Sequence, residues 1–218
     1  MARRVVAVKA DRRRAASDAP EPVAERKSEA TRRRILEAAA RVFTRNGYAD
    51  TRLSDIAAEA GTFAGSIYYY FDSREALVEA VLTIGVNSVA DAVRSAVEAL
   101  PPGVDHRARI TAAITAHLSS SLMLDIFASA NQRLFAQMPG DIRQRQIRLH
   151  RAYGGFWRQL LEEARRAGAI RRDIDLAVLR LQILGAMNWS VEWYRPGKRS
   201  VDEIAAQLAT TIFDGVAV

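Results

Sequence analysis

The chain has 218 residues, 49% of them hydrophobic, with no cysteine and a net charge of +7. This composition is typical of a globular protein, and the lack of cysteine excludes disulfides, thiolate nucleophiles and cysteine-ligated metal sites. No run of roughly 18 or more apolar residues occurs and the basic N-terminus lacks a following apolar stretch, so we expect neither a membrane-spanning helix nor a secretory signal.

The excess positive charge lies at the N-terminal end of the chain. Residues 1–47 carry 13 Lys or Arg and 6 Asp or Glu, whereas residues 48–218 carry 19 of each. A local basic patch beside a folded domain favours a polyanionic partner such as a nucleic-acid backbone, and a solubilising tail is the alternative. Residues 1–27 show no helical period and contain a Pro-Glu-Pro stretch, so we predict a disordered basic arm there, with DNA contact left open.

From Ser28 onward the apolar residues follow a helical period, and strand-like alternation is missing, which predicts an all-α fold of about nine helices. The Pro-Pro-Gly at 101–103 is expected to end the fourth helix and to precede the larger helical part of the chain, residues 104–218. Residues 28–75 are predicted to form a compact head, and residues 76–218 a body for ligand binding and dimerisation. In chain order, the expected helices cover residues 28–46, 52–61, 64–71, 73–100, 106–122, 124–138, 141–167, 175–194 and 200–214.

Capping residues support several of these boundaries. Thr51 is expected to cap the second helix, and Asp72 and Glu75 have the spacing of a capping box before the fourth. Ser200 and Glu203 have the same spacing before the last helix.

Residues 51–71 have the pattern of two short helices joined by a glycine-containing turn, which predicts a helix-turn-helix. Gly61 permits the sharp turn without Cβ strain. Three consecutive tyrosines cannot all face the core of a helical protein. We interpret Tyr70 as a core residue and expect Tyr68 or Tyr69 to contact DNA, because small residues before them let the backbone approach the major groove.

Several segments of the head resemble the TetR family of bacterial repressors. They are Thr31–Ala40, Phe43, Gly47-Tyr48, Thr51, Asp55–Gly61, Gly65–Phe71 and Ser73–Leu77. The resemblance implies a nine-helix dimer in which the first three helices bind DNA and helices five to nine hold the ligand and the dimer surfaces. It also implies repression, although activators share the fold.

Carried over by position, the resemblance implies a DNA-contacting set, with Arg32 or Arg33 near phosphate. The other members of this set are Thr51, Ala64, Gly65, Ser66, Tyr68, Tyr69 and Arg74. Phe63 and Ala64 depart from the family pattern, which usually has a small polar residue and Lys at these positions. The operator sequence is therefore not predicted, and DNA shape is expected to carry much of the specificity.

The penultimate helix is apolar on two sides. Leu179, Ile183 and Met187 lie on one strip, and Leu181 and Leu184 on another. A helix of this kind needs two partners, which we interpret as the domain core and a second subunit in a four-helix interface. Burial inside a monomer is the alternative.

The middle of the body intersperses polar with aromatic side chains, which is typical of a ligand pocket, although ordinary packing is the alternative for any one residue. Gly154-Gly155 within a helix costs about 1 kcal/mol per Gly and indicates a need for space or a kink. The predicted pocket residues are Phe127, Asn131, Arg133, Phe135, His150, Tyr153, Trp157, Asn188, Trp189 and Arg195.

The Trp-Tyr-x-Pro-Gly sequence at 193–197 is similar to a TetR branch that senses acyl-coenzyme A thioesters. This similarity implies an effector of that class, with Arg195, and Arg133 or Arg151 as further choices, opposite the coenzyme A phosphates.

Catalysis is not predicted. We find no Gly-rich phosphate loop, nucleophile elbow or paired-carboxylate motif, and the three histidines lack metal-ligand spacing. The sequence therefore predicts a homodimeric repressor of the bacterial cytoplasm, at the nucleoid when bound to DNA, with no catalytic residues, cofactor, metal or membrane association. A helical protein-interaction module and a small-molecule-binding enzyme are the alternatives, and neither should bind duplex DNA.

Overall fold

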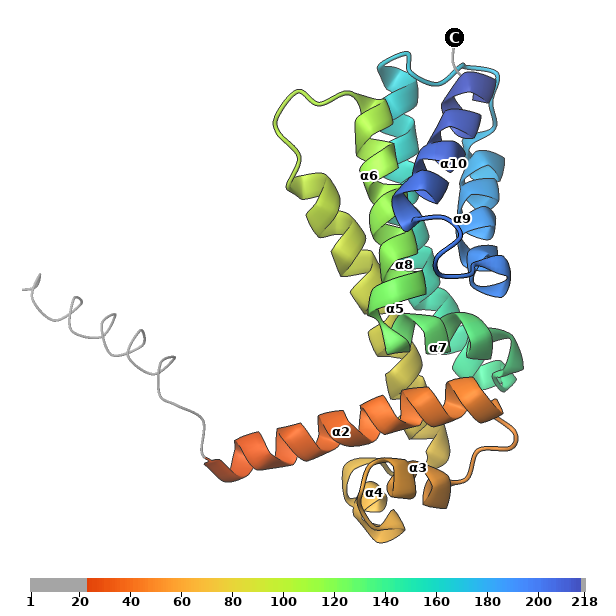
Figure 1. The fold of residues 1–218 in the computed structure, drawn as a ribbon. Helices are drawn as coiled ribbons and strands as arrows, with labels where there is room; N and C mark the ends of the chain where they lie inside the picture. The colour runs from red at the N-terminus through yellow and green to blue at the C-terminus, as the bar shows by residue number, and fades with distance from the viewer. Residues whose placement is uncertain (1–22, 217–218) are drawn as a thin grey trace, which may run out of the picture. The chain divides into compact units, whose positions relative to one another are not determined.

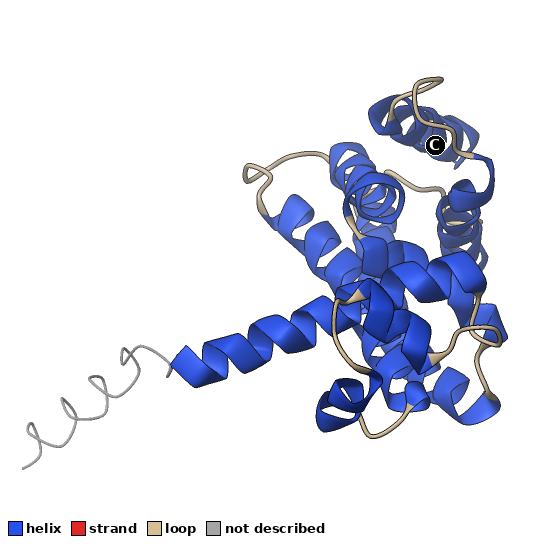
Figure 2. Ribbon diagram, turned by 60° about the horizontal axis from the view of Figure 1, so that its bottom comes forward, coloured by secondary structure: helices blue, strands red, loops and turns tan. Residues whose placement is uncertain are grey.

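The computed structural model describes residues 23–216, and all regular elements in this range are helical (Figures 1 and 2). This confirms the all-α prediction. Within this range lie nine α-helices, with a π-helical turn, η1, and a 3₁₀ turn, η2, on either side of α7. The elements are α2 (Val23–Asn46), α3 (Leu53–Glu59), α4 (Ala64–Tyr70), α5 (Arg74–Glu98), α6 (His106–Ser119), η1 (Ser120–Leu124), α7 (Ile126–Leu134), η2 (Phe135–Gln137), α8 (Gly140–Arg166), α9 (Leu176–Trp193) and α10 (Val201–Val216).

The chain divides into two compact units, residues 1–34 and residues 35–218. The described part of the first unit is the beginning of α2. This helix starts at Val23, so the predicted start at Ser28 is wrong by five residues and residues 23–27 are helical. The remainder of the predicted arm, residues 1–22, lies outside the described residues.

Two hydrophobic clusters form the core of the second unit. The head cluster joins α2 from Ile35 onward with α3, α4 and the first half of α5, and residues of α7 and α8 such as Leu134 and Ile142 complete it. The body cluster surrounds the fully buried Trp157 and joins the second half of α5 with α6, α8, α9 and α10. Because α5, α7 and α8 each contribute to both clusters, these three helices connect the head to the body.

By length and composition α5 could cross a membrane. Ten of its residues are nevertheless buried inside the protein, from Leu77 to Val97. A helix that is apolar on several sides and packs against two clusters is a core helix of the fold.

The caps show where local sequence decides a helix start. Ser73, and not the predicted Asp72, caps α5, because the Ser73 hydroxyl accepts a hydrogen bond from the Ala76 backbone N–H at 3.0 Å. The predicted capping box of α10 is confirmed. The Ser200 N–H donates to Glu203 Oε2 at 2.7 Å, and the Glu203 N–H donates to the Ser200 hydroxyl at 3.1 Å.

Candidate functional site

The α3–α4 pair is held by a glycine turn and a buried apolar face. Gly61 has a φ of +61°, the left-handed conformation that glycine adopts without Cβ strain, as predicted. Ile56 of α3 and Ile67 of α4 are fully buried, and Phe71 packs beside them in the head cluster. The opposite side of α4 is therefore presented to solvent on a fixed support.

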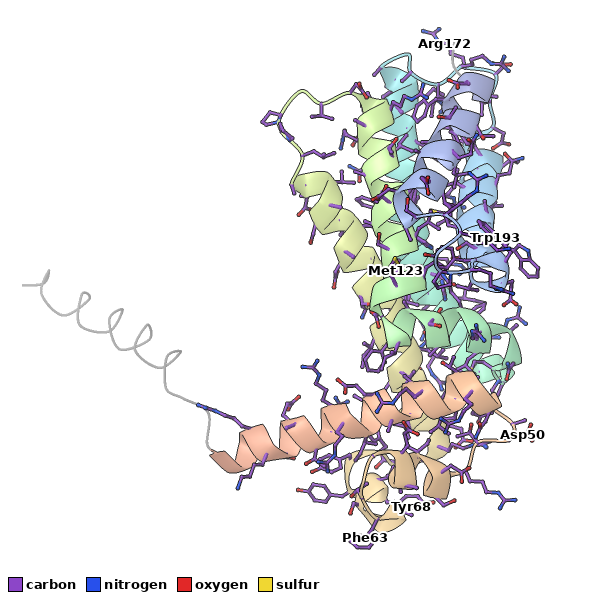
Figure 3. The ribbon with its side chains drawn as sticks, viewed as in Figure 1. Asp50, Phe63, Tyr68, Met123, Arg172 and Trp193 are labelled. Atoms are coloured by element: carbon purple, nitrogen blue, oxygen red, sulfur yellow. The ribbon has the colours of Figure 1, made fainter. Side chains whose placement is uncertain are left out.

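The exposed side of α4 is rich in aromatic residues. Tyr68 is 59% exposed, Tyr69 80% and Phe63, at the N-cap, 85%. Figure 3 shows Phe63 and Tyr68 projecting outward from this end of the molecule. Tyr70 is half-buried, and its ring centre lies 4.9 Å from that of Tyr69 in an edge-to-face arrangement. We call the exposed residues Phe63, Ala64, Gly65, Tyr68 and Tyr69 the α4 surface; Ser66 beside them is half-buried.

Two members of the predicted DNA-contacting set, Thr51 and Arg74, support the loop before α3. Thr51 is buried, and its hydroxyl donates to the Gly47 carbonyl at 2.6 Å. The Arg74 guanidinium donates to the carbonyls of Thr51 at 3.0 Å and Tyr48 at 3.2 Å, and it lies 4.3 Å from the centre of the Tyr48 ring. The predicted N-cap at Thr51 is therefore wrong, since Arg52 is the N-cap of α3 and the Thr51 hydroxyl is bonded inside the protein. The DNA contacts of Thr51 and Arg74 stay predictions.

The basic residues of α2 differ in their partners. Arg41 and Arg45 pair with Glu59 at 2.9 and 3.5 Å, and the hydrogen bond from Arg41 is the largest cause that lowers the pKa of Glu59. Arg32 and Arg33 are exposed side chains of α2 in the other compact unit. Their proximity to phosphate therefore stays a prediction.

A cavity of about 420 Å³ lies in the body among α5, α6, α7, α8 and α9. Its lining combines aliphatic residues with polar ones. The lining residues are Gly85, Val86, Val89, His117, Ala128, Asn131, Gln132, Ile147, His150, Arg151, Tyr153, Gly154, Arg180, Leu181, Leu184, Gly185 and Asn188. This volume lies in the range of small-molecule sites.

Of the ten predicted pocket residues, Asn131, His150, Tyr153 and Asn188 line the cavity. The other six lie elsewhere for identifiable reasons. Trp157 is fully buried in the body cluster, Phe127 packs against the head cluster, and the Phe135 ring stacks edge-on to His150 outside the lining. Arg133 and Trp189 are exposed, and Arg195 donates to the carbonyls of Glu192 and Tyr194.

Sequence reasoning missed His117 and Arg180. Each stands alone on a different helix, and only packing brings them to Tyr153 and Gly154 of α8. The predicted need for space holds at Gly154, because a Cβ there would lie 2.5 Å from Arg180 Nη1. Gly155 has open space beside it.

A buried hydrogen bond crosses the cavity wall between α6 and α8. His117 Nδ1 lies 2.8 Å from the Tyr153 hydroxyl, and both side chains are buried. Burial lowers the pKa of His117 to about 4 and raises the pKa of Tyr153, so both are neutral at physiological pH. His117 Nε2 has no hydrogen-bond partner among the described residues.

The helix α7 connects the cavity to the head. Asn131, which lines the cavity, donates to the Leu82 carbonyl of α5 at 3.0 Å. After α7, Gln137 accepts a hydrogen bond from the Tyr48 backbone N–H at 3.0 Å. A displacement of α7 would therefore act directly on the loop that precedes α3.

The outer face of α9 carries exposed apolar side chains. Val178 is 50% exposed, Leu181 63%, Trp189 67% and Trp193 49%, and we call these four residues the α9 face. Trp193 is labelled in Figure 3, where its ring projects outward beside α9. On the opposite side Leu179, Ile183 and Met187 belong to the body cluster, as predicted. Leu184, predicted to share the second strip with Leu181, instead packs against the body cluster.

Comparisons with known proteins cover both parts of the chain. Residues 35–81 match the family described as bacterial regulatory proteins, tetR family, and residues 103–216 match the tetracyclin repressor-like C-terminal domain. The transcriptional repressor KstR2 of Rhodococcus jostii is 30% identical over 192 residues, which cover 85% of this chain and 91% of that relative.

Two solved structures show the same fold. AibR, in complex with isovaleryl coenzyme A and operator DNA, has a TM-score of 0.74 and 24% identity, covering 84% of this chain and 98% of its own. FadR from Bacillus subtilis, in complex with stearoyl-CoA, has a TM-score of 0.71 and 20% identity, covering 84% of this chain and 98% of its own.

Proposed function

The chain belongs to the TetR family of bacterial regulatory proteins, and from this premise we propose that it is a dimeric repressor that leaves its operator when an acyl-CoA thioester enters the cavity. Family membership makes it a transcription regulator rather than an enzyme, as expected. The observation that carries the proposal is the α4 surface, which presents exposed aromatic side chains on a rigid support. We place its action in the cytoplasm, at the nucleoid when DNA is bound.

The chemistry of the α4 surface fits a DNA groove. Tyrosine hydroxyls donate to phosphate oxygens and base acceptors. The exposed Phe63 adds an apolar side chain that suits a thymine methyl group. Ala64 and Gly65 carry little side chain, which allows the backbone of α4 to come close to the base edges.

The test begins by recovering the operator through a genomic pull-down with the purified protein. Gel-shift titrations at one fixed salt concentration then compare the wild type with Tyr68→Ala. We expect affinity to fall about tenfold, the effect of losing one or two contacts. Met123→Ala, which removes an exposed apolar side chain from the body, is the matched control and should bind as the wild type. Unchanged affinity in both Tyr68→Ala and Tyr69→Ala would contradict the proposal.

We further propose that the α9 face and α10 form the dimer interface. Exposed apolar patches of this kind mark association surfaces, and a two-fold axis would bring α9 and α10 of each subunit into a four-helix contact. Trp189→Glu should yield a monomer in sedimentation equilibrium and lose operator affinity, since a single head holds DNA weakly. Ala99→Glu, at the exposed C-cap of α5, should stay dimeric. If the Trp189→Glu variant stays dimeric, the dimer interface does not lie on the α9 face.

Arg151 lines the cavity and is exposed, which suits contact with a coenzyme A phosphate. Repression ends if the ligand favours a position of α7 that displaces the loop before α3. Calorimetry with acyl-CoA esters and free fatty acids tests the effector class, and an absence of heat from every thioester would remove it.

A further inference from the structure

We propose that His117 recognises a carbonyl-type oxygen of the ligand, that Tyr153 positions His117 as a hydrogen-bond donor, and that Arg151 and Arg180 receive the ligand's anionic group. This inference rests on the proposed function and specifies the ligand chemistry of the same cavity.

The hydrogen-bond network assigns the proton of His117. The Tyr153 hydroxyl lies 2.8 Å from the imidazole Nδ1, and the Trp157 indole, which can only donate, is the other described side chain that acts on it. If the imidazole donated from Nδ1, the phenol proton would be left without an acceptor. The hydroxyl therefore donates to Nδ1, and a neutral imidazole then carries its proton on Nε2.

The Nε2–H group lacks an acceptor within the described structure. Its nitrogen is buried in the side chain that lines the cavity, and His117 as a whole is 3% exposed. A side-chain interaction with Asn188, which also lines the cavity, partly offsets the lowering of the His117 pKa by burial, but it lies outside normal hydrogen-bond geometry and leaves Nε2 unsatisfied. A buried donor without a partner is costly, so this group is best explained by a ligand acceptor that completes it.

Two other lining residues show the same feature. Gln132 Oε1 and His150 Nε2 are also buried without a hydrogen-bond partner in the described part of the chain. Three incomplete polar groups around one cavity indicate a ligand with several polar atoms, in addition to the apolar part that Val86, Val89 and other aliphatic residues accommodate.

The charge of the lining favours an anion. It contains Arg151 and Arg180 and no Asp or Glu. Neither guanidinium has an ion pair or hydrogen bond with a described residue. The Arg180 guanidinium lies beside the Cα of Gly154, in the space that a Cβ would take in any other residue. An acyl thioester carries a carbonyl oxygen and distant phosphates, whereas a free fatty acid carries both features in its carboxylate.

The test uses three probes with the same eight-carbon chain. Octanoyl-CoA has the thioester carbonyl, octyl-CoA is the thioether that lacks this oxygen, and octanoate is the free acid. Calorimetry with the full-length wild-type protein should show octanoyl-CoA binding about tenfold more tightly than octyl-CoA, since one hydrogen bond to a buried donor distinguishes them. Tighter binding of octanoate than of octanoyl-CoA would also support recognition of an oxygen by His117, and it would identify the ligand as a free acid rather than a thioester.

The variants test each residue's part. His117→Leu should abolish the preference for octanoyl-CoA over octyl-CoA, and Tyr153→Phe should reduce it to within about threefold, because the imidazole loses its fixed tautomer. Arg180→Gln should weaken octanoyl-CoA and octyl-CoA equally. His106→Gln, on the same helix but outside the cavity, should retain the tenfold preference.

Circular dichroism confirms folding of each variant, and Tyr153→Phe carries the test if His117→Leu does not fold. Equal affinity of the wild type for octanoyl-CoA and octyl-CoA, or no binding of any probe, would overturn the inference. Gel shifts on the same samples separate this failure from failure of the proposed function. A protein that binds its operator but does not distinguish the thioester from the thioether retains the proposed function, whereas one that binds no DNA loses it.

Discussion

The head cluster and the body cluster are both built from packed helices, but only the body cluster borders a cavity. The head cluster is packed with short aliphatic and aromatic side chains, including three consecutive alanines at 38–40, around the fully buried Phe43. The body cluster borders a cavity whose wall contains a buried histidine with an incomplete hydrogen-bond set. We infer that the head is optimised to hold a surface, whereas the body gives up stability to receive a ligand.

The largest expected effect tests whether the two clusters unfold together. Phe43→Ala should lower the free energy of unfolding by about 4 kcal/mol, because it leaves a cavity in the head cluster. All three tryptophans lie in the body, so their fluorescence during urea unfolding follows the body cluster while circular dichroism follows all helices. Coincident shifts of both signals would show one cooperative unit, as the shared α5 predicts.

Phe63→Ala is the matched control for this substitution. Its side chain is 85% exposed, so the unfolding midpoint should not move. A shift in the circular dichroism signal alone for Phe43→Ala would mean that the two clusters are independent.

The next effect concerns the junction between head and cavity. A Cβ at Gly85 would overlap the backbone carbonyl of Phe127, so α5 and α7 cannot keep their close approach in Gly85→Ala. We expect a loss of about 3 kcal/mol in urea unfolding, from overpacking against backbone that cannot move aside. An unchanged unfolding midpoint would contradict this contact between α5 and α7.

The third effect is a pH dependence of the free energy of unfolding, which arises from His117 in the wall of the cavity. The pKa of His117 is about 4 in the folded protein against 6.5 unfolded, so the unfolded state binds more protons between these values. Its contribution to stability is present above pH 6.5 and is lost as the pH falls towards 4. Between pH 7 and pH 5 the free energy of unfolding should fall by about 2 kcal/mol from this residue. Burial lowers the pKa of His150 too, which adds to the loss in the same direction.

His117→Leu should flatten this pH dependence, measured by urea unfolding at equal protein concentration. A slope as steep in His117→Leu as in the wild type would assign the pH dependence to other groups.

The smallest expected effect is an increase in stability, whereas the others are losses. Gly155 has open space around its Cα, so Gly155→Ala should stabilise α8 by up to about 1 kcal/mol through helix propensity. Gly154→Ala is the matched comparison, since its methyl group must displace Arg180. Thermal unfolding should separate the two variants, and equal midpoints would mean that Arg180 does not occupy the space over Gly154.

Much of the head was predictable because its signals are local. Glycine at 61, the buried Ile67 and the exposed Tyr68 and Tyr69 follow from helical period and turn chemistry within twenty residues. The error at Thr51 has a physical cause: a hydroxyl that can cap a helix or reach DNA can also bond a carbonyl one turn away, and here it bonds Gly47.

By itself the sequence determined the helical class, the breaks between helices and the face that each amphipathic helix must bury. Only the tertiary structure decided which of these faces meet and where they leave space. His117 and Tyr153 lie 36 residues apart on different helices, and no period relates them. Apolar periodicity specifies that a face is buried but not against which partner, so the cavity and its incomplete polar groups emerge only when five helices are packed together.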